Sequence, residues 1–533
     1  MPSIYNPLQH QTRNTACNMN SQHHFSSFIL FIVHILLLSE CQCQQNQCSL
    51  TKKEIESRDP ALVKMKYNIG DGKKTFWAYV TPPVSSFYQR DPPALRKVTP
   101  MHNGQAAKFI NLSNNSISVY WEPQPGAFDE GRAVEIRRIP PFSAKGTSTF
   151  PTHSFVYATT DDGIAVKRFV VQDVDNASDD VGENLYPYDP YDDPSNQKKA
   201  HEIVKHELSK QDEEMYWTWR KTLSFDKEYR KVTGRTYLAS YRRPPPIHFM
   251  WPANYFNQVH WVTTRETHFT SSPGDIARTT VNLRRIEGDE PIALEQYRDQ
   301  AAYLNMSLKV LSCAPRVFEI ENFLSPIEVD HIIEMGTAAT LGDSTLGDEG
   351  GDPKKRNVRT SKNTWVSRHQ SAIIDSIYRR AADLMRIDEA MLRTRTKEEE
   401  HNINKISNNL KPANKSIAED LQLVHYSVSQ EYQAHHDFAY APLSDEVDSA
   451  RFATLLLYLN EDMKGGETAF PRYINAHTFL PLQVKPVRGK AVLFYSQLPD
   501  GNFDDFSQHA AKKVFSGEKW LINLWVWDPI RVR

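Results

Sequence analysis

Short runs of alternating hydrophobic and polar residues occur in two parts of the chain. The first set lies within residues 100–178 and consists of Ala107–Leu112, Ser116–Trp121, Ser154–Thr159 and Ala165–Val171. Clusters of Asn, Pro, Gly and Ser separate these runs, a pattern that predicts a small antiparallel β-sandwich. The second set is C-terminal and consists of Leu421–Val428, Arg451–Asn460, Lys490–Leu498 and Lys519–Trp527.

Helical periodicity precedes the second set of strands. Ser325 and Glu328 have the spacing of a capping box, with Pro326 at the first helical position, and we expect this helix to end at Gly336. The next helix has apolar residues at helical spacing, namely Ile374, Ile377, Ala381 and Leu384. Helices followed by strands predict facing sheets that are flanked by helices.

The segment between the two sets of strands is mixed. Asp179–Gln197 is acidic and rich in Pro and Tyr, which is typical of a linker, and Lys199–Leu223 is a charged helical candidate. We therefore predict a multidomain chain. Its parts are a signal peptide or signal anchor (1–48), an unassigned segment (49–99), the β-sandwich (100–178), a linker with an unassigned α/β region (179–311) and a C-terminal domain (312–533).

The composition is that of a globular protein. The chain has 533 residues, of which 40% are hydrophobic and 24% are charged, and this excludes a fibrous repeat, a wholly disordered chain and a multi-span membrane protein. Lys and Arg number 63 against 65 Asp and Glu, for a formal net charge of -2. Because no overall field would attract nucleic acid, we expect no nucleic-acid partner.

One strongly apolar segment, Phe25–Leu38, lies near the N-terminus. Its length suits the hydrophobic part of a secretory signal and is short for a bilayer span. We predict a lumenal protein of the endoplasmic reticulum or secretory pathway, with a single-pass membrane anchor as the alternative to a cleaved signal. Such a protein can be a glycoprotein, and the N-x-S/T sites are Asn111, Asn114, Asn176, Asn305 and Asn414.

The segment HYSVSQEYQAHHDF, residues 425–438, contains metal-ligand residue types. His435 and Asp437 are two residues apart, so in an extended backbone they point to one face, whereas His436 points to the other. His509 is the third candidate. Two imidazoles and a carboxylate on one face of a metal leave three open positions, as in non-haem Fe(II) oxygenases. These three residues alone do not exclude an unrelated surface cluster.

A lysine begins the strand that follows His509. Alternation along this strand places Lys519, Leu521, Asn523, Trp525 and Trp527 on one face. A buried lysine needs a carboxylate partner, and the sequence offers no obvious protein partner. The distal carboxylate of 2-oxoglutarate is a suitable partner, with the keto-acid end of that molecule on the metal.

These residues and their neighbours resemble the prolyl 4-hydroxylases among the Fe(II)/2-oxoglutarate dioxygenases. The matching pieces, spread from residue 314 to residue 530, are Arg359-Thr360-Ser361, HYSVSQEYQAHHDF (425–438), RFATLLLYLNEDMKGGETAFP (451–471), VRGKAVLFYS (487–496) and HAAKKVFSGEKWLINLWV (509–526). They occur in the order and spacing of the family. The resemblance implies a double-stranded β-helix, a jelly-roll barrel with the metal inside.

The resemblance also implies the site and its chemistry. His435, Asp437 and His509 correspond to the Fe(II) ligands, and Lys519 corresponds to the residue that anchors 2-oxoglutarate. The implied reaction is the 4-hydroxylation of proline in a peptide or protein substrate. It is coupled to the conversion of 2-oxoglutarate and O2 to succinate and CO2, and ascorbate is the further cofactor.

Five other residues correspond to family positions around this site. Tyr426 and Thr468 match further 2-oxoglutarate contacts. Tyr432 and Trp525 match positions beside the iron, and Arg451 matches a position beside the peptide substrate.

Two alternatives stay open for the C-terminal domain. One is a hydroxylase of another residue, such as lysine, because the triad and Lys519 identify the reaction class better than the substrate. The other is a catalytically inactive barrel that serves as a binding module.

Residues 106–171 resemble the β domain of the von Hippel-Lindau tumour suppressor, whose sandwich binds hydroxyproline. The corresponding positions are Tyr120 or Trp121, Thr149, His153 and Phe155, where Phe155 replaces the tryptophan of that family. The resemblance suggests that this sandwich holds substrate or product, and a purely structural sandwich is the alternative.

Overall fold

The computed structural model describes residues 62–69, 72–79, 105–123, 133–161, 163–171, 184–192, 199–233, 235–240, 242–270, 284–285, 303–344, 359–399, 416–438, 450–473 and 482–528. The predicted signal or anchor, Phe25–Leu38, lies outside these residues, as do Asn176 and Asn414. Within the described part of the chain, no helix has both the length and the apolar character needed to cross a membrane.

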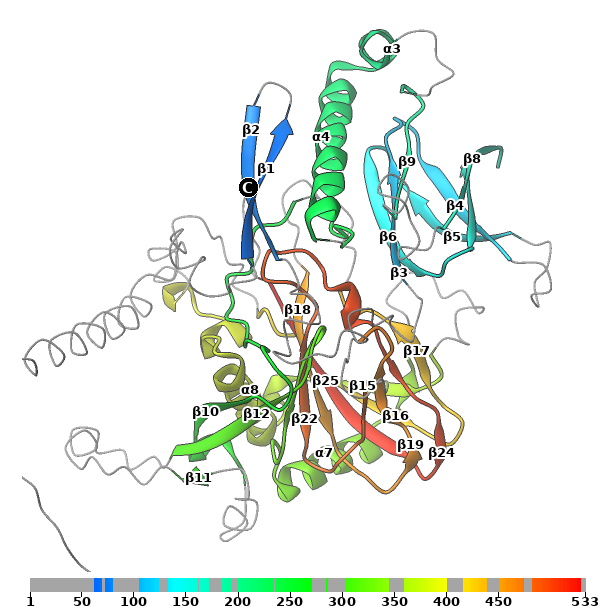
Figure 1. Cartoon of the computed structure of the whole chain (residues 1–533). Helices are drawn as coiled ribbons and strands as arrows, with labels where there is room; N and C mark the ends of the chain where they lie inside the picture. The colour runs from blue at the N-terminus through cyan, green and yellow to red at the C-terminus, as the bar shows by residue number, and fades with distance from the viewer. Residues whose placement is uncertain are drawn as a thin grey trace, which may run out of the picture.

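A ten-stranded antiparallel sheet forms the centre of the C-terminal part (Figure 1). In order across the sheet, its strands are β10 (Val259–Arg265), β12 (Tyr303–Cys313), β13 (Arg316–Ile320), β22 (Ala491–Tyr495), β18 (Arg451–Tyr458), β25 (Lys519–Trp527), β16 (Leu421–Tyr426), β15 (Lys362–Val366) and β14 (Gly342–Asp343), and β11 (Arg284–Arg285) pairs with β12. Three of these strands, β10, β11 and β12, lie wholly or largely before residue 312. The sheet therefore extends into the region for which the sequence predicts no fold.

A smaller sheet covers one face of the main sheet. Its strands, in order, are β17 (Tyr432–His435), β23 (His509–Ala511), β20 (Thr468–Phe470) and β21 (Leu482–Val484), and a separate pair is β19 (Lys464–Gly465) with β24 (Val514–Ser516). Buried side chains from both sheets share one core, which includes Val424, Leu456, Phe470, Phe494 and Leu521. Two sheets with a common core between them agree with the expected jelly-roll architecture.

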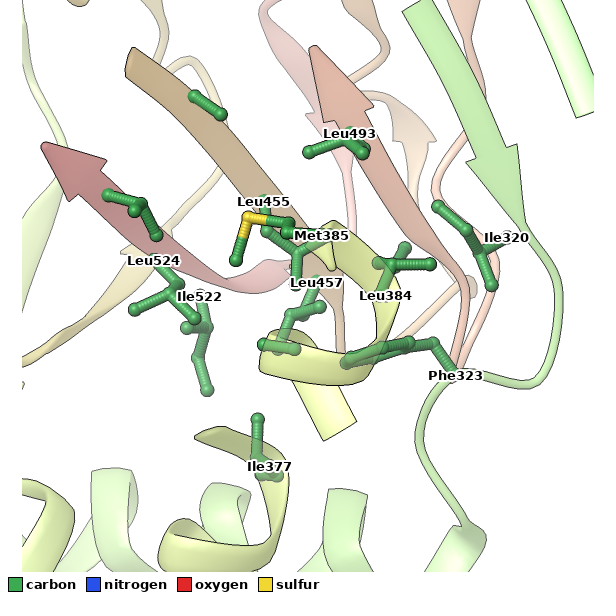
Figure 2. Packing of buried hydrophobic residues seen from close by; sticks show 14 of the residues in the cluster. Ile320, Phe323, Ile377, Leu384, Met385, Leu455, Leu457, Leu493, Ile522 and Leu524 are labelled. Atoms are coloured by element: carbon green, nitrogen blue, oxygen red, sulfur yellow. The ribbon is translucent and has the colours of Figure 1, made fainter. Parts of the chain in front are cut away.

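Helices cover the other face of the main sheet. These are α7 (Pro326–Ala338) and α8 (Ala372–Met385), with the short 3-10 helices η3 (Glu266–His268), η5 (Arg368–Gln370) and η6 (Glu389–Leu392) nearby. Figure 2 shows side chains of α8 against those of the sheet, among them Ile377, Leu384, Leu455, Leu457 and Ile522. The apolar face predicted for α8 is confirmed, since all four of its predicted residues are buried.

The start of α7 is confirmed and its predicted end is wrong. The Ser325 side chain accepts a hydrogen bond from the Glu328 backbone and the Glu328 side chain accepts one from the Ser325 backbone, which completes the capping box. The helix continues through Gly336 to Ala338. A Cβ atom at Gly336 would lie 2.6 Å from a side-chain carbon of Leu423, so the glycine permits close approach of helix and sheet rather than ending the helix.

The N-terminal part contains two further sheets that share a core. One has the order β6 (Ser143–Thr149), β3 (Gln105–Asn111), β9 (Leu185–Tyr188), and the other has the order β5 (Val134–Ile139), β4 (Ile117–Glu122), β7 (Ser154–Thr159), β8 (Ala165–Val170). Phe109 of the first sheet packs edge-on against Phe155 of the second. Strand β9 lies in the tract expected to be a linker. It contains Pro187, which a strand at the edge of a sheet tolerates because no ladder bond is lost there.

Two helices connect these sheets to the main sheet. The predicted helical segment forms α3 (Ala200–Glu207) and α4 (Lys210–Thr233). In Figure 1, α4 lies between the N-terminal sheets and a hairpin of β1 (Leu62–Ile69) and β2 (Gly72–Tyr79). Tyr216 and Trp219 bury one side of α4 against the N-terminal sheets. The far end of α4 reaches the C-terminal part.

Candidate active site

Three metal-ligand side chains meet at the small sheet. His435 ends β17, His509 begins β23, and the two residues are directly paired in the ladder. Asp437 follows His435 by two residues. Candidate ligand atoms of the three side chains all lie within 4.8 Å of one another. Residues separated by more than 70 positions in the chain thus form one cluster, as the sequence predicts.

The carboxylate of Asp437 is held by two donors from the main sheet. Its Oδ2 accepts hydrogen bonds from Thr454 Oγ1 at 2.6 Å and from Trp525 Nε1 at 3.0 Å. Burial acts to raise the pKa of Asp437, but the nearby His509 and His435 outweigh it and hold that pKa well below its usual range. A charged, oriented carboxylate is the form that binds a metal.

The two imidazoles are oriented by backbone carbonyls. His435 Nδ1 lies 2.8 Å from the carbonyl oxygen of Gln433, and His509 Nδ1 lies 3.0 Å from that of Ser507. Nδ1 can donate in both contacts, and each Nε2 is turned toward Asp437, at 3.7 Å and 3.6 Å from its oxygens. Burial holds the pKa of His435 well below its usual range, so its ring is neutral. Two imidazoles and one carboxylate fit the donor set of an Fe(II) facial triad.

Lys519 lies deep in the core between the sheets. Its side chain is 0% exposed, and its Nζ has no hydrogen-bond partner within the described residues. Burial lowers the pKa of Lys519 to about 7, against a smaller opposing effect of Glu467. An unpaired buried ammonium is costly, so this position favours an anionic ligand.

Aromatic rings and a close loop surround the Lys519 side chain. Its Nζ lies 5.4 Å from the ring centre of Tyr426 and 5.7 Å from that of Tyr458. Tyr458 donates a hydrogen bond to Thr468 Oγ1 at 2.7 Å. Of the two predicted 2-oxoglutarate contacts, Tyr426 thus lies beside the lysine, and Thr468 is bonded to a ring that does. Gly466 has φ +74, and a Cβ atom there would lie 3.2 Å from Lys519 Cδ, so a glycine is needed for this close approach.

Tyr432 borders the triad, as the sequence predicts. Its ring stacks on that of His435, with 3.5 Å between the ring centres. The guanidinium of Arg359 lies over the Tyr432 ring, 4.8 Å from its centre. This stack limits the motion of the most exposed ligand.

Arg451 and Trp525 lie beside Asp437. The guanidinium lies 3.8 Å from the Trp525 ring centre and donates to both oxygens of Glu419, at 2.6 Å and 2.9 Å. Trp527 donates to the same carboxylate at 2.6 Å. Arg451 is therefore fixed by the protein itself at the edge of the site.

Sequence reasoning missed Thr454, Tyr458 and Glu419. Thr454 and Tyr458 lie on β18, where two-residue alternation places them on the same face as Leu456, so that alternation is a signal that could have found them. Glu419 precedes β16 and has no local signal. The prediction for His436 agrees with the structure, since its Nε2 turns away from the triad to the backbone oxygen of Asp505 at 3.0 Å.

Comparison with known proteins identifies the family. Residues 421–527 match the 2OG-Fe(II) oxygenase superfamily. The Arabidopsis thaliana protein "Probable prolyl 4-hydroxylase 3" is 30% identical over 263 residues, which cover 45% of this chain and 83% of that protein. The chain belongs to the prolyl 4-hydroxylase family. It is accordingly an oxygenase that depends on Fe(II) and 2-oxoglutarate.

Other prolyl hydroxylases are similar to a comparable share of the chain. "Prolyl 4-hydroxylase 2" of Arabidopsis thaliana is 30% identical over 236 residues, which cover 41% of this chain and 69% of that protein. A crystal structure of the viral collagen prolyl hydroxylase from Paramecium Bursaria Chlorella virus-1, in its 2OG complex, is 23% identical, with a TM-score of 0.27 and coverage of 41% of this chain and 96% of that one.

A separate cluster lies on the N-terminal sheets. Thr149 Oγ1 is 3.1 Å from His153 Nδ1, and the Trp121 and His153 ring centres are 5.6 Å apart. Phe155 pairs with Trp121 across β4 and β7. The residues suggested by the von Hippel-Lindau resemblance thus lie together, and hydroxyproline binding there stays a prediction.

Proposed function

We propose that this chain hydroxylates C4 of proline in a peptide or protein substrate. One atom of O2 enters the proline C–H bond as a hydroxyl group, and the other enters succinate as 2-oxoglutarate loses CO2. The observation that carries the proposal is the buried, unpaired Lys519 in the same inter-sheet core as the triad. The site thus offers both a three-donor metal centre and a counter-charge for a dicarboxylate.

The triad residues would hold Fe(II), which when bound supplies the redox chemistry of O2 activation and C–H oxidation. His435, Asp437 and His509 each contribute one donor atom from one side, so other positions stay open for 2-oxoglutarate and O2. Thr454 and Trp525 hold the Asp437 carboxylate in place when the metal binds or leaves. This outer support keeps the donor set preorganised.

Lys519 pairs with the distal carboxylate of 2-oxoglutarate. With its pKa lowered to about 7 by burial, the lysine is only partly charged near neutral pH, and an entering carboxylate favours the protonated form. We assign Tyr426, whose ring lies beside the lysine, and Thr468, which is bonded to Tyr458, to the same end of the co-substrate. The lysine therefore selects a dicarboxylic 2-oxo acid over one without the second carboxylate.

The rings at the border position the peptide. Tyr432 stacks on His435 and Trp525 donates to Asp437, so each of these two metal ligands has an aromatic ring beside it, a surface suited to packing against a proline ring. Arg451, already bonded to Glu419, presents a fixed positive edge toward the carbonyl groups of the substrate.

A peptide panel tests this function. The purified chain is incubated with Fe(II), ascorbate, 2-oxoglutarate and matched peptides that carry either proline or lysine at the target position, and oxidised peptide and succinate are both quantified. We expect hydroxyproline and an equal amount of succinate, neither of which His509→Ala produces. Hydroxylysine without hydroxyproline would show that lysine, and not proline, is the substrate residue. A folded, metal-loaded chain that makes neither product would point to an inactive binding barrel.

We further propose that the chain acts in the lumen of the secretory pathway and uses ascorbate to keep its iron reduced. The apolar segment Phe25–Leu38 supports this location. Asn111 is fully buried and bonded to backbone carbonyls, whereas Asn114 is exposed, so we expect a glycan on Asn114 and none on Asn111. A mobility shift of the chain on glycosidase treatment, smaller in Asn114→Gln than in the unaltered chain, tests the location and the site; a cytosolic chain without glycans contradicts the location.

A further inference from the structure

The segment that leads into His509 is buried against a distant part of the chain. We call residues 496–508, between β22 and β23, the ligand loop, and it includes the 3-10 helix η7 (Asp505–Ser507). Its polar side chains Asp500, Asn502 and Asp504 are almost fully buried. Buried polar groups require partners, so what bonds them determines where the loop lies.

Those partners come from α4 and the residues after it. Tyr229 of α4 donates its hydroxyl to Asp500 Oδ2 at 2.8 Å. Asn502 accepts from the Leu238 backbone N–H at 2.8 Å and donates to the Thr236 carbonyl at 3.0 Å. These bonds connect positions more than 260 residues apart in the chain.

The backbone contact between the two segments is also close. Gly501 has φ +93, and a Cβ atom there would lie 2.3 Å from the carbonyl oxygen of Pro244. Arg235 forms an ion pair with Asp504 at 3.1 Å. The ligand loop therefore packs closely against the segment after α4, and the backbone contact at Gly501 leaves no space for a side chain between them.

A second contact reaches the residue after Asp437. Phe438 stacks on Phe503 of the ligand loop, with 4.6 Å between ring centres and 6° between planes, and both belong to a buried cluster with Phe225 and Tyr229 of α4. The end of α4 thus supports the segments that carry two of the three metal ligands.

Asp505 ties the ligand loop to the N-terminal sheets. Its carboxylate accepts from the backbone N–H of Ala106 in β3 at 3.3 Å and forms an ion pair with Arg472. Its backbone oxygen lies 3.0 Å from Nε2 of His436, the residue between His435 and Asp437. One residue therefore contacts both ligand-bearing segments and the first strand of the N-terminal sheets.

A buried ion pair makes α4 and β3 one unit. Lys108 Nζ of β3 lies 2.5 Å from Asp226 Oδ2 of α4 and 2.7 Å from the carbonyl oxygen of Ala239, and both charged side chains are 0% exposed. Breaking such a pair would leave an unpaired buried charge, so β3, α4 and the segment after α4 move together.

We infer that the N-terminal sheets and α4 are part of the iron site, because they set the position of His509 and Asp437. Tyr229 and Asp505 are the positioning residues in this arrangement. The alternative is that this contact only joins two parts of the chain and has no effect on the positions of the metal-ligand side chains. This inference rests on the proposed function, because it assumes that the triad binds the iron of the reaction. The experiment that tests it measures metal binding and does not depend on turnover.

The experiment compares two tyrosines of the same helix in the full-length chain. Tyr229→Phe removes the hydroxyl that bonds to Asp500 of the ligand loop, and Tyr216→Phe removes the hydroxyl that bonds to Asp189 of the N-terminal sheets, at 3.1 Å. Metal-free protein is titrated with Co(II), and the absorbance of the bound ion gives the dissociation constant. Thermal unfolding of each metal-free variant reports the cost of losing a tyrosine hydroxyl.

We expect Tyr229→Phe to weaken Co(II) binding about tenfold, the lower end of the effect of losing a group that orients metal ligands. Tyr216→Phe should bind Co(II) as the unaltered chain does. Asp505→Asn, which keeps the shape of the side chain, should weaken binding in the same direction and serves as the test if Tyr229→Phe does not fold.

Equal Co(II) affinities for the two tyrosine variants, whether both unchanged or both weakened, would overturn the inference. An unaltered chain that binds Co(II) but makes no hydroxyproline would refute the proposed function and leave the positioning result standing. The two failures are thus distinguishable.

Discussion

Replacing Lys519 by methionine should stabilise the ligand-free protein while weakening its binding of 2-oxoglutarate. Burial lowers the pKa of this lysine from 10.5 to about 7. At about 1.4 kcal/mol per pKa unit, the fold disfavours the charged form by about 5 kcal/mol. Relaxation around the site reduces this amount, and replacement of buried charges by apolar residues commonly gains about 1–4 kcal/mol, which is the increase in unfolding free energy that we expect at pH 7.

The lowered pKa of Lys519 also predicts how the unfolding free energy changes with pH. The unfolded lysine keeps its proton up to pH 10.5, whereas the folded one releases it near pH 7. Between these values the unfolded state binds more protons, so the unfolding free energy of the unaltered chain rises with pH. Lys519→Met lacks this contribution, and its stability advantage should shrink from pH 7 to pH 9.

The assay is urea unfolding of the metal-free protein at both pH values, with calorimetric titration of 2-oxoglutarate into the metal-loaded protein. Lys490→Met is the matched control, because Lys490 pairs with Glu319 at 3.1 Å and its loss should lower stability and leave 2-oxoglutarate binding unchanged. Loss of a buried charge partner should weaken 2-oxoglutarate binding by about 2 kcal/mol or more, roughly 30-fold. A Lys519→Met chain that is less stable and binds 2-oxoglutarate normally would refute the reasoning.

Three further predictions concern the site and its support. His509→Ala should abolish Co(II) binding and turnover with little change in the thermal unfolding of the metal-free chain; retained hydroxylation would remove His509 from the triad. The dissociation constant of 2-oxoglutarate should rise about tenfold per pH unit above pH 7, since binding then requires proton uptake by Lys519; a flat profile in calorimetry would contradict this. Arg380→Met should lower the unfolding free energy by about 3–5 kcal/mol because it leaves Glu328 charged and buried, whereas Asp330→Asn on the exposed side of α7 should change it by less than about 1 kcal/mol. Equal urea midpoints for these two variants would show that the buried pair does not stabilise the helix contact.

Local patterns made the shared face of two metal ligands and the position of the lysine predictable, whereas the place of His509 in the triad came from the resemblance to a family. His435 and Asp437 share a face because they are two residues apart, and the alternation along β25 puts Lys519 and Leu521 on the inner face while Ile522 packs toward the helices. The capping box of α7 is equally local. Each of these features depends on neighbouring residues whose geometry the backbone determines.

Features that depend on distant contacts were not predictable. Glycine is common where helices end, so the sequence predicts a helix end at Gly336. Only the nearby Leu423 side chain explains why a glycine occurs inside the helix. Strand β9 forms because β3 offers it an edge, and its own sequence contains a proline. The docking of Tyr229 on Asp500 joins positions 271 apart, and no single pattern signals it.

The fate of the two oxygen atoms tests the central claim most directly. The purified chain is incubated with labelled 18-O2, Fe(II), 2-oxoglutarate, ascorbate and a proline peptide, and the peptide and succinate are examined by mass spectrometry with fragmentation. The account predicts one labelled oxygen on C4 of proline and one in succinate, in equal amounts. Labelled succinate with unlabelled, unmodified proline peptides across the panel would contradict proline as the substrate, and unlabelled succinate would contradict the coupled oxygenase reaction itself.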